Sequence, residues 1–451
     1  MAGDRVPVRL GAVCTKIGSG ATPRGGSEVY LEKGPYALIR SQNVYNDGFR
    51  YGGLAFIGEV HAQELQNVEV FENDVLLNIT GDSVARCCQV PAAVLPARVN
   101  QHVAIIRPDP EKLCPRFLRY FLVSDEMQNR LLSWAGSGGT RSALTKGMIE
   151  SCEVFAPRDV HEQRAIAHIL GTLDDKIELN RRMNETLEAM ARALFKSWFI
   201  DFDPVRMKAE GRSTKAEKRP AADSLHPSSF TLPPSLLDLF PDSFEDSELG
   251  EIPKGWKVGT LGDVAQHPRR GIQPNDIDPA TPYIALEHMP KRCIALADWG
   301  VADGLESNKF VFKKGEILFG KLRPYFHKVG VAPVEGVCST DIVVVTPRTE
   351  KWFGFVLAHV SSTAFVDCTN AGSTGTKMPR TNWAEMARYN VVLPPSPIAA
   401  TFSSFMASFV DRIIESVHES HTLAALRDAL LPKLISGELT IADANCIGSK
   451  A

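Results

Sequence analysis

The sequence contains an internal two-fold repeat, and this repeat constrains the fold more than any other feature. The motif Leu-Gly-x-Val begins at Leu10 and again at Leu261, an offset of 251 residues (261 − 10). The Gly- and Thr-rich segment 136–142 returns at 372–378, an offset of 236 (372 − 136). The offset shrinks along the repeat, as it does in divergent copies whose loops gain and lose residues. A two-fold repeat predicts a pseudo-symmetric molecule, and such a molecule is suited to a target of matching symmetry.

A long amphipathic helix is expected after each copy. Residues 161–199 contain no proline, and their apolar residues follow a heptad repeat that is interrupted by two polar layers. The same interruption recurs 236 residues later. Polar layers at matched central positions would meet if the helices pair as an antiparallel coiled coil; the alternative is that each helix packs only on its own domain. The candidate pairing residues are Leu173, Ile177, Asn180, Asn184 and Leu187 in the first helix, and Phe409, Ile413, Ser416, Ser420 and Leu423 in the second.

The two repeated domains, 1–158 and 249–395, are expected to be α+β with a curved sheet. Short apolar stretches punctuated by Gly, Pro and Asn predict strands, at 36–39, 74–79 and 102–106 in the first copy and at 283–286, 315–319 and 341–345 in the second. One helix is expected after each set, at 116–134 and 352–368. The long helices occupy 159–200 and 396–440, the Pro-, Ser- and charge-rich segment 201–248 is a partly ordered linker, and 441–451 is a tail.

The composition is that of an ordinary globular protein, with 44% hydrophobic and 23% charged residues. A net charge of −3 argues against a protein that coats polyanions over its whole surface, but a local basic groove is compatible with it. The nine cysteines form no CxxC pair, so no zinc pattern is present. We expect a cytoplasmic protein, because its cysteines are scattered and its N-terminus lacks the apolar core of a signal peptide. We expect no membrane span, because no long apolar run occurs.

The motifs of common catalytic sites are missing from the sequence. The segment 136–142 lacks the spacing of a Walker loop, and no [DN]-P-P-[FYW] motif of amino-methyltransferases occurs. Asp109 with Asp174-Asp175-Lys176 imitates the carboxylate–lysine set of nucleases, but the latter three residues lie on the heptad helix. We therefore expect no catalytic residue, no cofactor-binding residue and no metal ligand in this chain.

The predicted strand ends and loops instead carry groups suited to DNA. Arg and Lys can read guanine, Asn and Gln can read adenine, and Asp can accept from cytosine, while small loops let backbone N–H groups approach phosphate. Any one of these residues, taken singly, could instead be an ordinary solvated loop residue. DNA binding is favoured because such residues recur in corresponding loops of both copies. We align Arg40 with Glu287 and His102 with Asp341, differences expected if the copies read different half-sites. The DNA-binding candidates are Arg40, Gln42, Asn43, Asn78, Thr80, Asn100, Gln101, His102, Arg141 and Lys146 in the first copy, and Lys321, Arg323, Tyr325, Ser339, Thr340, Asp341, Thr376, Lys377 and Arg380 in the second.

Several stretches, taken in order, resemble the specificity subunit of type I restriction–modification systems across essentially the whole chain. These are the Leu-Gly-x-Val openings, the glycine-rich 136–140 before 154–157, HEQRAI at 161–166, ALFKSWF at 193–199 with FDPVR at 202–206, FEDSELGEIPKGW at 244–256, and LLPKLISGEL at 430–439. The second copy departs from the pattern at its helix entry, where Pro395-Ser396-Pro397-Ile398 replaces the His-Glu-Gln run.

The resemblance implies two target-recognition domains that each bind one half of a bipartite double-stranded DNA site. The helices would act as a ruler and would dock two methyltransferase (modification) subunits, which translocating restriction subunits would join. About 57 Å of helix limits the half-site separation to about 17 base pairs. S-adenosylmethionine, ATP and Mg²⁺ would then belong to the partners. A modification-only system fits the same sequence.

Two other classes of protein remain open. A coiled-coil adaptor that joins proteins without DNA would have no basic face on either repeated domain. An enzyme with an unrecognised site would have a closed pocket lined by coupled titratable groups.

Overall fold

The computed structural model of the chain describes residues 5–136, 142–209, 232–373 and 378–441. By its internal contacts the chain divides into two compact units, residues 1–176 with 422–451, and residues 177–421. Each unit contains one copy of the repeat and one part of each long helix. Within the described ranges, no helix has the length and apolar character needed to cross a membrane.

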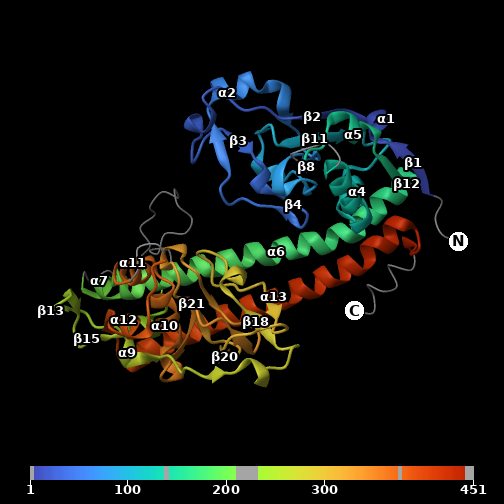
Figure 1. Cartoon of the computed structure of the whole chain (residues 1–451). Coiled ribbons are helices and arrows are strands. Elements are labelled where there is room, and N and C mark those ends of the chain that lie inside the picture. The colour runs from blue at the N-terminus through green and yellow to red at the C-terminus, as the bar shows by residue number, and fades with distance from the viewer. Residues whose placement is uncertain (1–4, 137–141, 210–231, 374–377, 442–451) are drawn as a thin grey trace. The chain divides into compact units, whose positions relative to one another are not determined.

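The first domain is built on two four-stranded sheets, ordered β6-β3-β10-β7 and β2-β11-β8-β9 (Figure 1). Leu76 and Ile105 lie in the core between these sheets. Their neighbours Leu77 and Ile106 point to the opposite face, which the helices cover. The elements are β1 Arg5–Arg9, α1 Leu10–Val13, β2 Cys14–Ser19, β3 Tyr36–Ile39, β4 Val44–Tyr45, β5 Gly48–Phe49, β6 Ala55–Ile57, α2 Glu59–Glu64, β7 Glu69–Val70, β8 Val75–Asn78, β9 Cys87–Gln89, β10 Ala97–Val99, β11 Val103–Pro108, α3 Pro115–Val123, α4 Asp125–Gly136, α5 Lys146–Ser151 and β12 Glu153–Pro157.

The second domain repeats this arrangement. Its sheet β16-β24-β21-β22 matches β2-β11-β8-β9, and its other sheet has the order β17-β20-β23-β18-β19. Leu318 and Val344 lie between the sheets, whereas Phe319 and Val345 face the helices. The elements are β15 Lys257–Thr260, α9 Leu261–Val264, β16 Ala265–Gln266, β17 Gly271–Ile272, β18 Pro282–Ile284, β19 Gly300–Val301, β20 Lys309–Phe312, β21 Ile317–Gly320, β22 Val329–Val331, β23 Gly336–Cys338, β24 Ile342–Pro347, α10 Phe353–Val360, α11 Thr363–Ala371, α12 Trp383–Ala387 and β25 Asn390–Leu393. The predicted α+β class is confirmed in both copies.

The single helix expected after each strand set was wrong in both copies, because each is two helices. Residues 116–134 fall in α3 and α4, which are separated at Ser124, and residues 352–368 fall in α10 and α11. In the second copy Ser362 has extended backbone angles, and its hydroxyl accepts a hydrogen bond from the Phe365 N–H, so it begins a new helix. Apolar periodicity continues across such a break and therefore does not reveal it.

The segment between the first long helix and the second domain has ordered ends. Short elements flank residues 210–231, which lie outside the described ranges: α7 Asp203–Ala209, α8 Pro234–Leu237, β13 Phe244–Ser247 and β14 Gly250–Pro253. Contacts between aromatic rings hold both ends of this segment against the rest of the second unit. Trp198 meets Phe240 edge-to-face at 5.1 Å, and Phe202 meets Trp256 at 5.7 Å.

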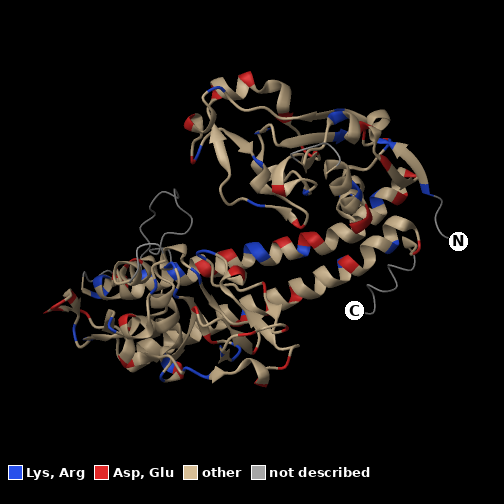
Figure 2. Ribbon diagram, viewed as in Figure 1, with Lys and Arg blue, Asp and Glu red and all other residues tan. Residues whose placement is uncertain are grey.

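The two long helices are α6 Val160–Phe199 and α13 Ser396–Ser436, and they pair antiparallel (Figure 1). Within the second unit, Asn180 donates to the Ser420 hydroxyl at 3.3 Å, while the Phe199 and Phe402 rings meet at 4.8 Å. A higher number on α6 thus meets a lower number on α13, so the expected antiparallel pairing is confirmed. Charged residues of both signs follow α6 (Figure 2); some pair within the helix, as Arg181 does with Glu178 at 2.7 Å, and others pair with neighbouring elements, as Asp175 does with Arg116.

The two polar layers behave differently. Asn180 is fully buried, and its amide also donates to Glu419 at 2.8 Å and to the Ser416 carbonyl at 3.4 Å. Asn184 is buried too, and the Oδ1 atoms of both asparagines have no hydrogen-bond partner among the described residues. Of the other candidate pairing residues, Ile413 is buried, whereas Leu173, Ile177, Leu187, Phe409 and Leu423 are half-buried.

Candidate nucleic-acid interface

Four loops of the first domain meet at one end of its central strands; we call them the first loop cluster (residues 40–43, 79–83, 100–102 and 142–144). Main-chain hydrogen bonds join them. Asn100 N–H donates to Ile39 at 3.0 Å, and Ile79 N–H donates to His102 at 3.0 Å. The Leu144 N–H then donates to the Ile79 carbonyl at 2.8 Å. Side chains far apart in sequence are therefore presented from one connected surface.

The second domain forms the same junction, the second loop cluster (residues 285–288, 321–325, 339–341 and 378–381). Ser339 N–H donates to Ile284 at 3.0 Å, Lys321 N–H to Asp341 at 2.9 Å, and Thr381 N–H to Lys321 at 3.1 Å. Each bond repeats one of the first cluster. The repeat thus extends from the sequence motifs to the individual hydrogen bonds of the loops.

These bonds also test how the two copies were aligned. His102 and Asp341 are equivalent, because each accepts the matching loop bond and directly precedes β11 or β24. The equivalence of Arg40 with Glu287 was wrong. Arg40 N–H is capped by the Asn43 side chain and Ala285 N–H by His288, so Arg40 corresponds to Ala285.

In the first loop cluster polar side chains surround the half-buried His102. Its Nδ1 lies 2.6 Å from the Thr80 hydroxyl, and its Nε2 lies 2.9 Å from the amide nitrogen of Gln101. The hydroxyl of Thr22 donates to the other end of the Gln101 amide. Thr22 is a member of the site that the sequence reasoning missed; the available signal was its place between Gly20 and Pro23, in a segment typical of a turn.

Three asparagines of the predicted set lie in the interior and hold the loops. Asn43 is fully buried and donates to the Arg50 carbonyl at 2.8 Å. Asn78 is fully buried and donates to the Ser41 carbonyl at 2.9 Å, and Asn100 accepts from the His102 N–H at 3.2 Å. In this conformation their amides fix the loop backbone and are not displayed on the surface.

The other candidates of the first domain lie at the margin of the cluster. Arg40 and Gln42 both donate to the Gly53 carbonyl, Gln42 at 3.0 Å. Lys146 is exposed on α5 and pairs with Glu150 at 3.4 Å. Arg141 lies outside the described residues, as do Thr376 and Lys377 of the second copy.

In the second loop cluster the charge pattern differs. Arg380 is exposed and lies 3.5 Å from Asp341, whose N–H donates to the Ser339 hydroxyl at 3.2 Å. Thr340 is exposed between Ser339 and Asp341, and Lys321 is half-buried. The two clusters thus share a backbone and present different side chains.

Basic residues beside β16 were not predicted as part of the site. The Nδ1 of His267 lies 2.8 Å from the Val344 carbonyl, so this nitrogen is the donor. Burial lowers the pKa of His267, the Val344 bond opposes this, and the charges of Arg269 and Lys321 lower it further. Arg269 is exposed and has a left-handed backbone (φ 47°). The Arg-Arg pair at 269–270 was the available sequence signal.

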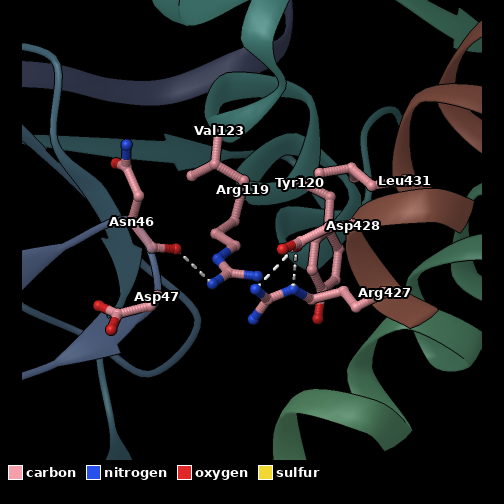
Figure 3. Close-up of a pocket in the computed structure, with 8 residues that line it drawn as sticks. All are labelled: Asn46, Asp47, Arg119, Tyr120, Val123, Arg427, Asp428 and Leu431. Carbon is pink, nitrogen blue, oxygen red and sulfur yellow. Dashed lines mark hydrogen bonds and ion pairs between the residues drawn. The ribbon is translucent and has the colours of Figure 1, made fainter. Parts of the chain in front are cut away.

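A cleft of about 150 Å³ lies elsewhere in the first unit, between the first domain and the C-terminal part of α13 (Figure 3). Arg119 donates from one side to the Asn46 carbonyl at 2.8 Å and from the other to Asp174 at 2.7 Å. Arg427 reaches the same carboxylate at 2.7 Å, and Tyr120 donates to it at 2.7 Å. The carboxylate and both guanidinium groups are thereby satisfied within the protein.

This network also separates the nuclease-like residues. Asp109 pairs with Lys112 at 3.2 Å, whereas Asp174 is bound by Arg119 and Arg427. Burial raises the pKa of Asp174, but Arg119 and the hydrogen bonds from Arg427 and Tyr120 outweigh it, so the pKa is lowered overall. Across the described ranges, no group of three His, Cys, Asp or Glu side chains could hold a metal ion.

Two α+β domains with matching loop clusters, joined to a pair of antiparallel helices, define a repeated recognition scaffold. The family model for the type I restriction modification DNA specificity domain matches residues 4–189 and again 253–421. The chain belongs to this family, as the motifs indicated.

Individual relatives agree with this assignment. The chain is similar to the Type I restriction enzyme HindI specificity subunit of Haemophilus influenzae, with 27% identity over 446 residues, covering 89% of this chain and 94% of that protein. The MjaIX specificity subunit of Methanocaldococcus jannaschii is 25% identical over 335 residues, covering 71% and 68%. The fold resembles the crystal structure of the type I restriction-modification S subunit from M. genitalium, with a TM-score of 0.54 at 13% identity and 96% of each chain covered.

Proposed function

We propose that this chain gives a type I restriction–modification complex its DNA sequence specificity, and that each repeated domain binds one half of a bipartite target. The observation that carries this proposal is the pair of loop clusters. The same main-chain bonds join the loops in both domains, from Asn100 to Ile39 in one and from Ser339 to Ile284 in the other. Two surfaces with one backbone and different side chains suit a target with two different half-sites.

Base contacts are assigned to the polar side chains at the surface of each cluster. In the first domain these are the exposed Gln101 and the half-buried His102, and a Gln amide suits the donor–acceptor edge of adenine. In the second they are Thr340 and Arg380; an Arg guanidinium suits guanine. Phosphate contacts are assigned to lysines and arginines at the margins, namely Lys146, Arg269 and Lys321.

The partners follow from this function. The paired helices would set the half-site spacing and dock two methyltransferase subunits, and restriction subunits would complete the complex. The chain itself would be non-catalytic. S-adenosylmethionine, ATP and Mg²⁺ would be bound by the partners, since the sequence contains neither a Walker loop nor the amino-methyltransferase motif.

The test is long-read modification mapping of a host that expresses this chain with the neighbouring methyltransferase gene. The expected result is a methylated motif of two short half-sites around a fixed unspecified gap. Arg380→Ala should relax one half-site and leave the other unchanged, because a bidentate Arg contact discriminates by about 1–3 kcal/mol. Arg388→Ala is the matched control, since Arg388 is an exposed arginine of the same domain that pairs with Glu385 on α12.

A soluble complex of both proteins that methylates no motif would contradict the proposal and favour the adaptor. If Arg380→Ala leaves the specificity of both half-sites unchanged, the assignment of Arg380 to a base contact is contradicted, and the proposed function still stands.

A further inference from the structure

The loop 322–328, which follows β21 in the second domain, is a turn with an unusual backbone. Arg323 (φ 51°, ψ 65°) and His327 (φ 52°, ψ 54°) both have left-handed conformations, on either side of the 3-10 turn Pro324–Phe326. Residues other than glycine rarely adopt this conformation. It persists only where the surrounding structure holds it, and such residues cluster at binding sites.

The surrounding structure does hold this loop at both ends. The Arg323 N–H donates to the Pro379 carbonyl at 2.7 Å, and the Gly320 N–H donates to Lys328 at 2.8 Å. His327 is only 6% exposed, and its Nε2 donates to the Ser361 carbonyl at 2.8 Å. The loop is therefore fixed before any partner binds, which reduces the entropy that binding would cost.

The fixed loop displays an aromatic ring. Tyr325 is 49% exposed at the apex, although it is an aromatic residue. Its ring rests on Phe326 at 4.8 Å, and the Lys291 ammonium lies 4.5 Å from the centre of the Phe326 ring. Leu322 forms a bridge with Arg380, so the loop adjoins the residue assigned to base contact. An exposed ring beside cations is the combination that stacks on bases while the cations contact phosphate.

The first domain has the same turn without the aromatic ring. There Gly81 (φ 76°) and Ala85 (φ 71°) have left-handed conformations on either side of residues 82–84, and the Asn78 N–H donates to the Arg86 carbonyl at 2.8 Å as the Gly320 N–H does to the Lys328 carbonyl. The residue equivalent to Tyr325 is Ser83 (325 − 83 = 320 − 78). The aromatic ring is thus a specific addition to one of two matching loops.

We infer that Tyr325 stacks on a base of the target duplex and opens one base step, and that it does so only in the half-site bound by the second domain. Side-chain wedges of this kind exchange base stacking for contact with the protein and distort the duplex locally. The inference rests on the proposed function, because it requires DNA on the second loop cluster.

The experiment uses the complex with its methyltransferase subunits and duplexes of the mapped target that carry 2-aminopurine. The probe is placed at each position except the methylated adenine, since the methyltransferase is expected to extrude that base itself. Fluorescence should rise on binding at one step of the second domain's half-site and at none of the first. Tyr325→Phe should preserve the rise, whereas Tyr325→Ala should abolish it and weaken binding about 5- to 150-fold.

The control is Phe71→Ala, which removes a similarly exposed ring (50%) that precedes β8 at the end opposite the first loop cluster. It should leave affinity and fluorescence unchanged. If Tyr325→Ala binds like the wild type and gives the same fluorescence, the inference is overturned while the proposed function stands. If the wild-type complex methylates no bipartite motif, the proposed function itself fails.

Discussion

Removing the Asp174 carboxylate should destabilise the first unit strongly. Asp174 accepts hydrogen bonds from Arg119, Arg427 and Tyr120, all at 2.7 Å. The side chains of Arg119 and Arg427 are only 7% and 15% exposed. Asp174→Ala would leave the Arg119 guanidinium buried without its counter-ion, and would leave Arg427 only its pair with Asp428 at 2.8 Å, whose side chain is 63% exposed. Removal of one partner from a buried ion pair costs about 3–5 kcal/mol, and we expect a loss of that size.

The neighbouring Asp175 provides a matched control. Asp175 lies next to Asp174 on α6 and pairs with Arg116 of α3, but the side chain of Asp175 is 66% exposed. Exposed pairs contribute about 0–1 kcal/mol, so Asp175→Ala should cost less than this. Urea unfolding of both variants, followed by far-ultraviolet circular dichroism, measures the difference.

A double-mutant cycle with Arg119→Ala tests the physical cause. Because that substitution removes the group left unpaired, the double variant should lose much less than the sum of the two single losses. The reasoning would be refuted if Asp174→Ala and Asp175→Ala cost the same, or if the losses at Asp174 and Arg119 were additive.

Four further predictions concern other sites. Burial lowers the pKa of His359 to about 3, so below about pH 6.5 the unfolded chain binds a proton that the folded chain does not. Stability should then fall by up to about 1.4 kcal/mol per pH unit as the pH decreases, and urea titrations of His359→Leu should show a shallower fall. Glu188 accepts from the N–H groups of Ile294 and Ala295 at 3.1 and 3.2 Å; in urea unfolding, Glu188→Ala should cost about 2–4 kcal/mol because two donors lose their partner, and Glu188→Gln should cost less. The exposed thiol of Cys368 should react with a thiol reagent in the folded protein, as peptide mass spectrometry would show, and protection of Cys368 equal to that of the buried cysteines would contradict this. Lys321→Ala should weaken DNA binding equally for all sequences and reduce its salt dependence by about one charge, measured by fluorescence anisotropy across salt concentrations.

The sequence predicted the paired helices well, because heptad spacing is a regular signal over many turns. The polar layer at Asn180 was anticipated, and its bond to Ser420 is present. Glu419, which is the nearest acceptor for Asn180 at 2.8 Å, was not anticipated. It lies beside the heptad seam, and the heptad pattern says nothing of long side chains that reach in from its flank.

The position of each loop residue was harder to predict, since one apolar run resembles another. Tyr36 of β3 is followed by Ala, Leu and Ile, and Tyr283 of β18 is followed by Ile, Ala and Leu. An alignment that matches these tyrosines shifts the second copy by two residues. Only the pairing of Ile39 with Val99 and of Ile284 with Cys338 fixes the register. Strand register depends on hydrogen bonds to partners distant in sequence, and a single sequence contains no direct record of them.

The roles of individual polar residues were also ambiguous. Asn78 and Gln101 both have a side-chain amide, the group expected to contact adenine, yet Asn78 is fully buried and Gln101 is exposed. Asp174 was considered beside Asp109, but its partners Arg119 and Arg427 are 55 and 253 residues away. The same side-chain amide or carboxylate can hold a fold together or bind a partner, and only the tertiary structure decides between these roles.

The main-chain bonds within the loop clusters have a consequence for how such a protein changes over generations. The bonds from Ile79 to His102 and from Lys321 to Asp341 join backbone atoms, so they do not depend on which side chain occupies either position. Exposed positions such as Gln101 and Thr340 can therefore mutate with little loss of folding stability. A lineage could acquire a new DNA preference in one domain by a few surface substitutions while the other domain keeps its own.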